Sequence, residues 1–228
     1  MKWPTIEELS AMVPLPKGFR FERLARANIA PLIAAIRIWH PDISVGAASC
    51  YLREDFYRNR ACLDGEADKD IWVVTFTHND ELAGMWSFER EVESLAIYGR
   101  LIVVAPAHRG TRLSVLAMMG TEKLGRAMGA AFLYGMATLK TPYAQRALER
   151  AGYRLLGFFP GYDREEVAPG VVKRVYQAVY AKLLVPDEEV LRPDPKNMTP
   201  KARALFELLF PDKAAAIAQS AAPAGAGG

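Results

Sequence analysis

Cysteine and histidine are scarce in this chain of 228 residues, which contains two cysteines and three histidines. Cys50 and Cys62 are too few for a disulfide framework, and neither lies in a CxxC pattern that would bind zinc. The histidines are scattered singly, so we expect no metal site. The cysteine usage is typical of a protein from a reducing compartment.

Long hydrophobic runs and a strong charge of one sign are also missing. The sequence contains no run of 18 apolar residues, so no transmembrane helix is predicted. The first residues lack the apolar core of a signal peptide. Twenty-nine basic residues against 26 acidic ones give a net charge of +3, whereas nucleic-acid-binding domains usually carry a larger, clustered basic excess. We therefore expect a cytoplasmic protein that binds neither nucleic acid nor membrane.

What the chain does contain is the composition of an ordinary globular protein, with 51% apolar and 24% charged residues. The hydrophobic periodicity changes along the chain and predicts the order β-α-α-β-β-β-α-β-α-β-β, ending near Leu184. Asn28 and the Thr141-Pro142 pair are predicted to begin two of the helices. Strands are predicted at about 19–24, 71–77, 82–88, 95–104, 132–138, 153–159 and 171–184, and helices at about 28–39, 45–58, 111–128 and 141–152.

The composition changes after residue 184, where four prolines between residues 186 and 200 indicate a linker. The Thr199-Pro200 pair predicts the start of one more helix. We therefore expect a folded domain at 1–184, a Pro-rich linker with a helix at 185–213, and a disordered Ala/Gly tail at 214–228.

The junction between the strand ending at Val104 and the next helix carries the most informative residues. Arg109 and Arg112 lie at the helix N-terminus, where the helix dipole disfavours cations by about 0.3–1 kcal/mol each. No acidic residue follows until Glu122. The free backbone N–H groups at the helix start favour a bound anion. Gly110 would let a phosphate approach the backbone closely. Alternatively, both arginines point to solvent or pair with distant carboxylates. Neither a Walker loop nor a GxGxxG pattern is present.

The segment Leu101–Thr111, which reads Leu-Ile-Val-Val-Ala-Pro-Ala-His-Arg-Gly-Thr, resembles the acyl-coenzyme A binding motif of the GNAT acetyltransferase superfamily. A second block, 144–153, resembles that family's Ala-containing helix ending in Gly and an aromatic residue. The resemblance covers about residues 17–184. It implies an α/β (α+β) fold of GNAT type, with a mixed, mostly antiparallel sheet of about seven strands flanked by about four helices, plus a C-terminal helical extension.

The resemblance also implies where the acyl donor, acetyl-CoA or another acyl-CoA, would bind. Backbone groups of the strand would pair with the pantetheine arm, and N–H groups of the following turn would hold the pyrophosphate. The strands of the two blocks would splay apart at Val103 and Phe132. The donor-binding residues predicted in this way are Ile102, Val103, Val104, His108, Arg109, Gly110, Thr111, Arg112, Leu113 and Arg146.

The sequence departs from the family pattern at positions that matter for the chemistry. Ala107 stands where Gln or Arg is usual, and Arg112 stands where a small residue is usual. The tyrosine that protonates the leaving thiolate in the family falls at Leu148, which cannot donate a proton. Tyr143, about one helical turn away, is the predicted substitute, although a surface or packing aromatic residue would give the same pattern.

A general base is needed only if the acceptor arrives as an ammonium ion. The family's carboxylates often lie on the strand before the motif, at positions that are Tyr98 and Arg100 here. The nearest carboxylates are Glu89, Glu91 and Glu93 on the preceding hairpin, and a regular strand would place all three on one face. Glu91 is the candidate base. A solvated acidic edge is the alternative interpretation.

We predict an N-acetyltransferase in which an amine attacks acetyl-CoA directly in a ternary complex. The acceptor would be a small-molecule or peptide amine, and three acids in the loop 159–170, over the mouth of the cleft, would suit a cationic one. Two other functions stay open. One is a CoA-binding regulatory module without transfer chemistry. The other is an enzyme that makes N-acyl amino acids or lactones from longer acyl donors. That enzyme's acyl site would be lined by Met85, Trp86, Phe88, Phe132 and Met136. The sequence is compatible with a homodimer.

Overall fold

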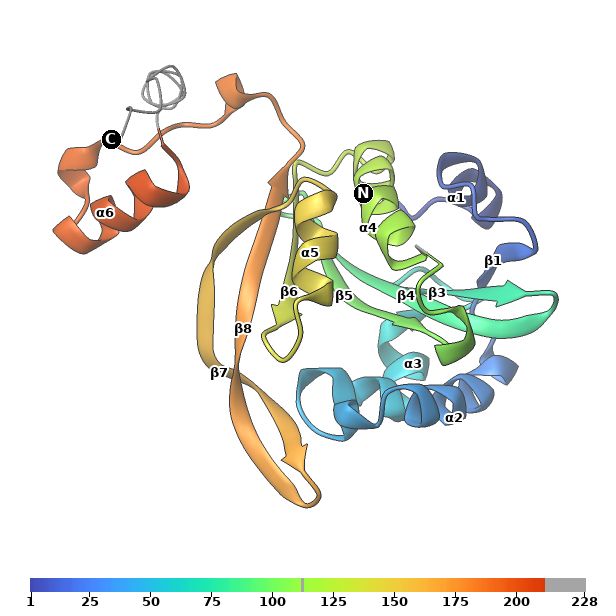
Figure 1. Cartoon of the computed structure of the whole chain (residues 1–228). Helices are drawn as coiled ribbons and strands as arrows, with labels where there is room; N and C mark the ends of the chain where they lie inside the picture. The colour runs from blue at the N-terminus through green and yellow to red at the C-terminus, as the bar shows by residue number, and fades with distance from the viewer. Residues whose placement is uncertain (112, 212–228) are drawn as a thin grey trace, which may run out of the picture. The chain divides into compact units, whose positions relative to one another are not determined.

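The computed structural model describes residues 1–111 and 113–211, and the chain divides into two compact units, Met1–Val185 and Pro186–Gly228. Within the described residues, the first unit contains one sheet of eight strands with helices on both faces (Figure 1).

The strand order in the sheet is β1-β3-β4-β5-β6-β8-β7, with β2 beside β3. The pairs β5–β6 and β2–β3 are parallel, and the remaining pairs are antiparallel. The predicted mixed, mostly antiparallel sheet is therefore confirmed, and the two-residue β2 is its additional strand. The strands are β1 (Phe19–Arg23), β2 (Ala61–Cys62), β3 (Ile71–His78), β4 (Glu81–Glu91), β5 (Ala96–Val104), β6 (Phe132–Thr138), β7 (Arg154–Ala168) and β8 (Val171–Leu183).

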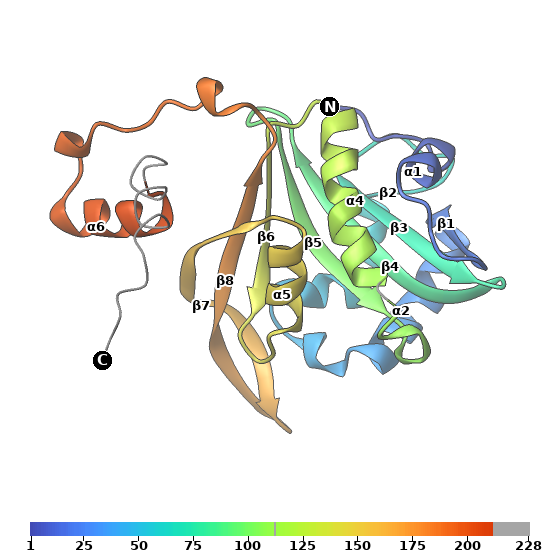
Figure 2. The same cartoon turned by 45° about the horizontal axis from the view of Figure 1, so that its top comes forward.

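Two hydrophobic cores lie on opposite faces of the sheet. Strand β3 contributes alternate side chains to each, with Trp72 and Val74 in one core and Ile71 and Val73 in the other. Figure 2 shows α4 and α5 in front of the sheet and α2 behind it. The first core is covered by α1 (Ile6–Met12), α4 (Leu113–Ala127) and α5 (Tyr143–Arg150), and the second by α2 (Ile29–Trp39), α3 (Glu54–Arg60) and the 3-10 helices η2 (Pro41–Ser44) and η3 (Ala47–Leu52).

The helix starts differ from the sequence predictions. Helix α1 was not predicted, although Thr5 and Glu8 form a capping box that marks its first turn. Asn28 precedes α2 but makes no side-chain cap, because its backbone already belongs to a preceding 3-10 turn. Helix α5 begins at Tyr143 with Pro142 as its N-cap residue, so Thr141 does not cap it.

The hairpin formed by β7 and β8 is longer than predicted. The segment 159–170, expected as a loop, continues β7 as far as Ala168. Pro160 and Gly161, whose residue types predict a turn, lie where the β7–β8 register shifts between Phe159 and Asp163. The strand forms a bulge there and continues.

The second unit contains a short helix, α6 (Pro200–Leu209), between irregular segments. Thr199 caps it by accepting a hydrogen bond from the Ala202 N–H, as the sequence predicted. Arg192 donates to the Phe210 carbonyl at 2.7 Å and lies over the ring of Phe206, which joins the linker to the helix. The predicted tail, 214–228, lies outside the described residues. In the described part of the chain, no helix combines the length and the apolar composition needed to cross a membrane.

Candidate active site

Strands β5 and β6 pair over only part of their length. The parallel register joins Ala96–Gly99 to Phe132–Gly135 and then stops. Figure 1 shows the two strands diverging beyond this point. In the described structure no strand pairs with the β6-facing edge of 100–104, so the backbone groups of that edge are open to another partner.

A β-bulge accounts for the divergence. On β4, Ser87 faces Leu101 and Phe88 faces Gly99, so Arg100 has no partner there. A bulge bends a strand and increases its twist, which turns the end of β5 away from its neighbour. The strands were predicted to separate at Val103 and Phe132. They separate after Gly99 instead, because Phe132 is still paired, with Ala96.

The turn after β5 leads directly into α4. Pro106–His108 forms a 3-10 turn (η4), and the Thr111 hydroxyl donates to the His108 carbonyl at 2.6 Å. Gly110 has a φ of 83°, and a Cβ placed there would meet no atom of the described residues within 4 Å. The backbone at the start of α4 is therefore open to a ligand. Leu113, the first residue of α4, is buried, and Arg112 lies outside the described residues.

Arg109 holds this turn against α2. Its guanidinium donates to the Trp39 carbonyl at 2.7 Å and to the Val104 carbonyl at 3.4 Å. Trp39 ends α2, where carbonyls lack helical partners and carry partial negative charge. Burial lowers the pKa of the neighbouring His40, and the Arg109 charge lowers it further. Arg109 thus stabilises the carboxyl end of α2.

The other predicted residues on the α4 and α5 side lie near the surface. The ring of His108 packs edge-on against Phe19 and His78, with centroids 5.2 and 5.0 Å away. Tyr143 is 75% exposed at the start of α5, and Arg146 is exposed three residues later, so both lie on one helix face. Leu148 is buried in the first core.

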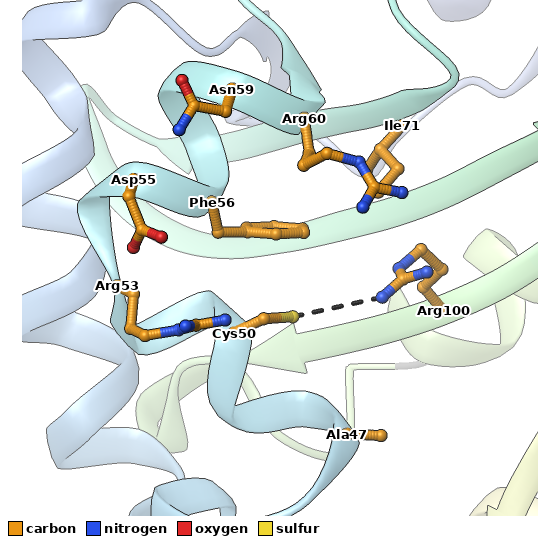
Figure 3. A pocket seen from close by; sticks show the side chains of 9 residues that line it. All are labelled: Ala47, Cys50, Arg53, Asp55, Phe56, Asn59, Arg60, Ile71 and Arg100. Atoms are coloured by element: carbon orange, nitrogen blue, oxygen red, sulfur yellow. Dashed lines mark hydrogen bonds between the residues drawn. The ribbon is translucent and has the colours of Figure 1, made fainter.

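On the opposite face, a small cavity of about 90 Å³ crosses the divergence of β5 and β6. Tyr98 and Arg100 of β5 lie on one side of it, and Met136 of β6 lies on the other. A larger cavity of about 400 Å³ adjoins it, because Ala47 and Arg100 line both (Figure 3). The remaining lining residues of the small cavity are Ala48, Tyr51, Tyr162, Asp163 and Gln177.

Arg100, the bulge residue, is the centre of the polar contacts between the cavities. It donates to the Glu89 carboxylate and, at 3.1 Å, to the Tyr51 hydroxyl, which is 2.6 Å from the Ser87 hydroxyl. Burial opposes its charge, but Tyr51 and Glu89 more than offset this and raise the pKa of Arg100. Sequence reasoning noticed Arg100 only as the absence of a carboxylate.

Glu91 lies where β5 and β6 are still paired, opposite Ala96. The Tyr134 hydroxyl donates to its carboxylate, and the Tyr134 ring stacks on Tyr98 with centroids 4.8 Å apart. Burial raises the pKa of Tyr134, and Glu91 raises it further; burial raises the pKa of Tyr98 to about 12. Both phenols therefore stay protonated at neutral pH. Glu93 lies in the turn after β4, so the three carboxylates predicted on one strand face are reduced to two.

Strand β7 closes one wall of the site. The Asp163 carboxylate accepts from the Ala47 N–H at 2.7 Å, and a Cβ on Gly46 would lie 2.2 Å from the Arg164 carbonyl. Of the three acids predicted to face the cleft, Asp163 alone lines the small cavity. Glu165 pairs with Lys140 at 3.0 Å, and Glu166 accepts from the Ser44 hydroxyl and the Gly170 N–H.

A mixed sheet that opens between two parallel strands, with a turn and a helix beginning beside the opening, defines the fold of the GNAT acetyltransferases. The chain has this fold. No family model matches its sequence, and no curated protein matches it.

Several solved structures share the fold. The ribosomal L7/L12 alpha-N-protein acetyltransferase RimL, in complex with coenzyme A, is 10% identical with a TM-score of 0.56, over 75% of this chain and 97% of that one. The ribosomal-protein-S18-alanine N-acetyltransferase from Escherichia coli is 12% identical with a TM-score of 0.58, over 77% and 99%. The ribosomal-protein-S5-alanine acetyltransferase from Vibrio fischeri is 7% identical with a TM-score of 0.56, over 78% and 98%.

Proposed function

We propose that the protein is an acyl-CoA-dependent N-acyltransferase that moves an acetyl group from acetyl-CoA to a primary amine. One observation carries this proposal: the free edge of β5 leads straight into the open turn at Gly110 and the N-terminus of α4. A strand edge offers alternating N–H and C=O groups to an amide-containing chain such as pantetheine. The N–H groups at the start of a helix suit a pyrophosphate.

The donor-binding residues fall into three groups. Backbone groups of the free edge would hold the pantetheine arm, the turn and first α4 residues would hold the pyrophosphate, and a cation on α5 would flank the donor. The absence of an acidic residue in the first turn of α4 supports the second assignment. The residues proposed are Ile102, Val103 and Val104; His108, Arg109, Gly110, Thr111, Arg112 and Leu113; and Arg146.

In the proposed reaction, the amine nitrogen attacks the thioester carbonyl. A C–N bond forms, the C–S bond breaks, the nitrogen loses a proton and the sulfur gains one. A backbone N–H near Val103 or Val104 would stabilise the charge that develops on the carbonyl oxygen. The small cavity across the strand divergence would hold the amine, so most of the acceleration would come from bringing two bound substrates together.

Two side chains are proposed for proton transfer. Tyr143 would donate to the leaving sulfur, and its exposed position on α5 leaves its hydroxyl accessible. Glu91 would accept the proton of an ammonium acceptor through Tyr134, which donates to it and stacks on Tyr98 at the cavity wall.

A second function, CoA binding without transfer, draws support from Leu148, which is buried where the family's proton donor falls. The longer-chain alternative loses support, because Met85, Trp86 and Phe88 pack into the two cores on opposite faces of the sheet.

Thermal unfolding with and without acetyl-CoA, followed by release of the CoA thiol with a panel of amines, tests the proposal. Ligand at about a hundred times its Kd should add about 2.7 kcal/mol, or about 5–10 °C for a domain of this size. Thiol release that depends on an amine supports the transferase. A thermal shift without release at any amine supports the binding module, and no shift at saturating acetyl-CoA refutes both.

A further inference from the structure

Three arginines line the larger cavity. Arg53 comes from the segment between η3 and α3, Arg60 from the end of α3, and Arg100 from the bulge in β5. Figure 3 shows Arg60 and Arg100 with their guanidinium groups turned toward one another beside the ring of Phe56. Like charges converging on one cavity repel unless an anion lies between them.

The carboxylates nearby do not balance this charge. Glu89 is shared, since it accepts from Arg100 and lies 3.7 Å from Arg60. Asp55 is the other carboxylate at the cavity, so three guanidinium groups face two carboxylates. Arg53 is exposed and makes no side-chain hydrogen bond or ion pair with the part of the chain that the structure describes, so its guanidinium is free to bind a ligand. Its planar fork matches a carboxylate.

The smaller cavity combines a carboxylate with the Arg100 guanidinium that it shares with the larger cavity. The Asp163 carboxylate lines it, and its bonds to the Ala47 and Arg164 N–H groups both use one oxygen, Oδ1. Gln177 also lines this cavity. It is only 7% exposed, and its side-chain amide makes no hydrogen bond within the described residues. Among the described residues, the fully buried polar atoms without a partner do not include those of Gln177, so its amide is open to the cavity and can bond a polar ligand there.

The geometry points to a small amino carboxylate as the acceptor, with its amine in the smaller cavity beside Asp163 and Gln177 and its carboxylate against Arg53, Arg60 and Arg100. Ala47 and Arg100 line both cavities, so the two adjoin and a short molecule with a charged group at each end would reach from one to the other. This inference rests on the proposed function and names the substrate class of that site. The products are the N-acetylated amino carboxylate and free CoA, with one proton released overall at neutral pH when the amine enters as an ammonium ion.

The test compares matched acceptors in the full-length protein. We would measure acetyl-CoA-dependent thiol release with the ω-amino acids from glycine to 6-aminohexanoate, each beside its carboxamide. The carboxylate of the best length should exceed its amide in kcat/KM by about tenfold or more, the size of one hydrogen bond to a charged group. Titration calorimetry of the same compounds into CoA-saturated protein should give the same preference without turnover.

The variant Arg53→Gln locates the carboxylate. It should raise KM for the preferred amino acid about tenfold, with little change in kcat, and should leave the amide's KM unchanged. Arg58→Gln is the matched control, because Arg58 lies on the adjacent helix, pairs with Glu54, and lines neither cavity.

The outcomes separate the two proposals. Equal rates for amides and carboxylates, or an Arg53→Gln effect no larger than that of Arg58→Gln, overturns the acceptor class while the transferase stands. Arg53-dependent binding of amino carboxylates, with no transfer to any amine, supports the ligand class and refutes the transferase. Failure of every amino carboxylate to bind CoA-saturated protein overturns the inference directly.

Discussion

Replacing Gly110 with alanine should separate the donor site from the stability of the fold. Gly110 has a φ of 83°, in the left-handed region that costs a residue with a Cβ about 1–2 kcal/mol. The added methyl group meets no atom within 4 Å in the described part of the chain, so the substitution introduces strain without a clash there. In the proposed complex, however, the methyl group would project beside the pyrophosphate, where backbone N–H groups must approach closely.

Gly129, just after the other end of α4, is the matched control. Its φ is 72° and it too has open space around an added Cβ. Gly110→Ala and Gly129→Ala should therefore each lower the melting temperature of the free protein by about 2–8 °C, at 2–4 °C per kcal/mol. The two variants should differ only when the donor is present.

Melting curves with increasing acetyl-CoA measure that difference. Wild type and Gly129→Ala should show equal stabilisation by acetyl-CoA, whereas Gly110→Ala should need at least about tenfold more ligand for the same shift, the loss of roughly one hydrogen bond to a charged group. An undiminished shift in Gly110→Ala would refute the placement of the pyrophosphate at this turn. Equal losses in both variants would show that strain propagates along α4.

Three further predictions concern protons. Tyr143→Phe should leave the melting temperature nearly unchanged, because the ring is 75% exposed, and should lower kcat for thiol release about a hundredfold; an unchanged kcat removes Tyr143 as the proton donor. Glu91→Gln should lower kcat/KM at pH 7 by a similar factor. The kcat/KM of this variant should recover as the pH approaches the acceptor's own pKa, because a neutral amine needs no base. A loss of kcat/KM that is equal at every pH would instead indicate a structural role. The raised pKa of Tyr98, about 12, means that its phenol ionises first in the unfolded chain, near pH 10. Its contribution to stability is complete below pH 10 and is lost as pH rises toward 12, so Tyr98→Phe should lose less stability than wild type between pH 10 and 12 in denaturant titrations.

The sequence predicts the elements that local patterns encode. A run of β-branched and aromatic residues identifies β3, helical spacing identifies α4, and Thr199 identifies the start of α6. Each of these signals is contained within one element and its ends. The segment 101–111 carries enough of the family motif to predict the fold, which the structure confirms.

The bulge in β5 could not be predicted in the same way. Gly99 is a weak local signal for a bulge, but the sequence of β5 alone does not show that Arg100 lacks a partner. Whether Arg100 has a partner depends on β4, and where the strands separate depends on β6. Arg100, the bulge residue, lines both cavities, so local sequence patterns could not predict the acceptor side of the site. From the sequence, Gln177 is likewise only a polar residue in a strand. Its burial depends on the pairing of β8 with β6 and β7.

Arg109 shows why charge at a helix N-terminus has more than one physical explanation. The two arginines before α4 favoured an anion site, yet Arg109 is drawn to the carboxyl end of α2, contributed by residues 70 positions earlier. From Trp39 the chain continues into η2 and η3, and η3 lines both cavities. One guanidinium thus joins the turn proposed for the donor to the elements that form the acceptor wall. Replacing Arg109 would disturb both sides at once, and loss of donor binding in such a variant would not reveal an anion contact. An added Cβ at Gly110 contacts no side chain that the structure describes, so Gly110 is the sharper probe of that turn.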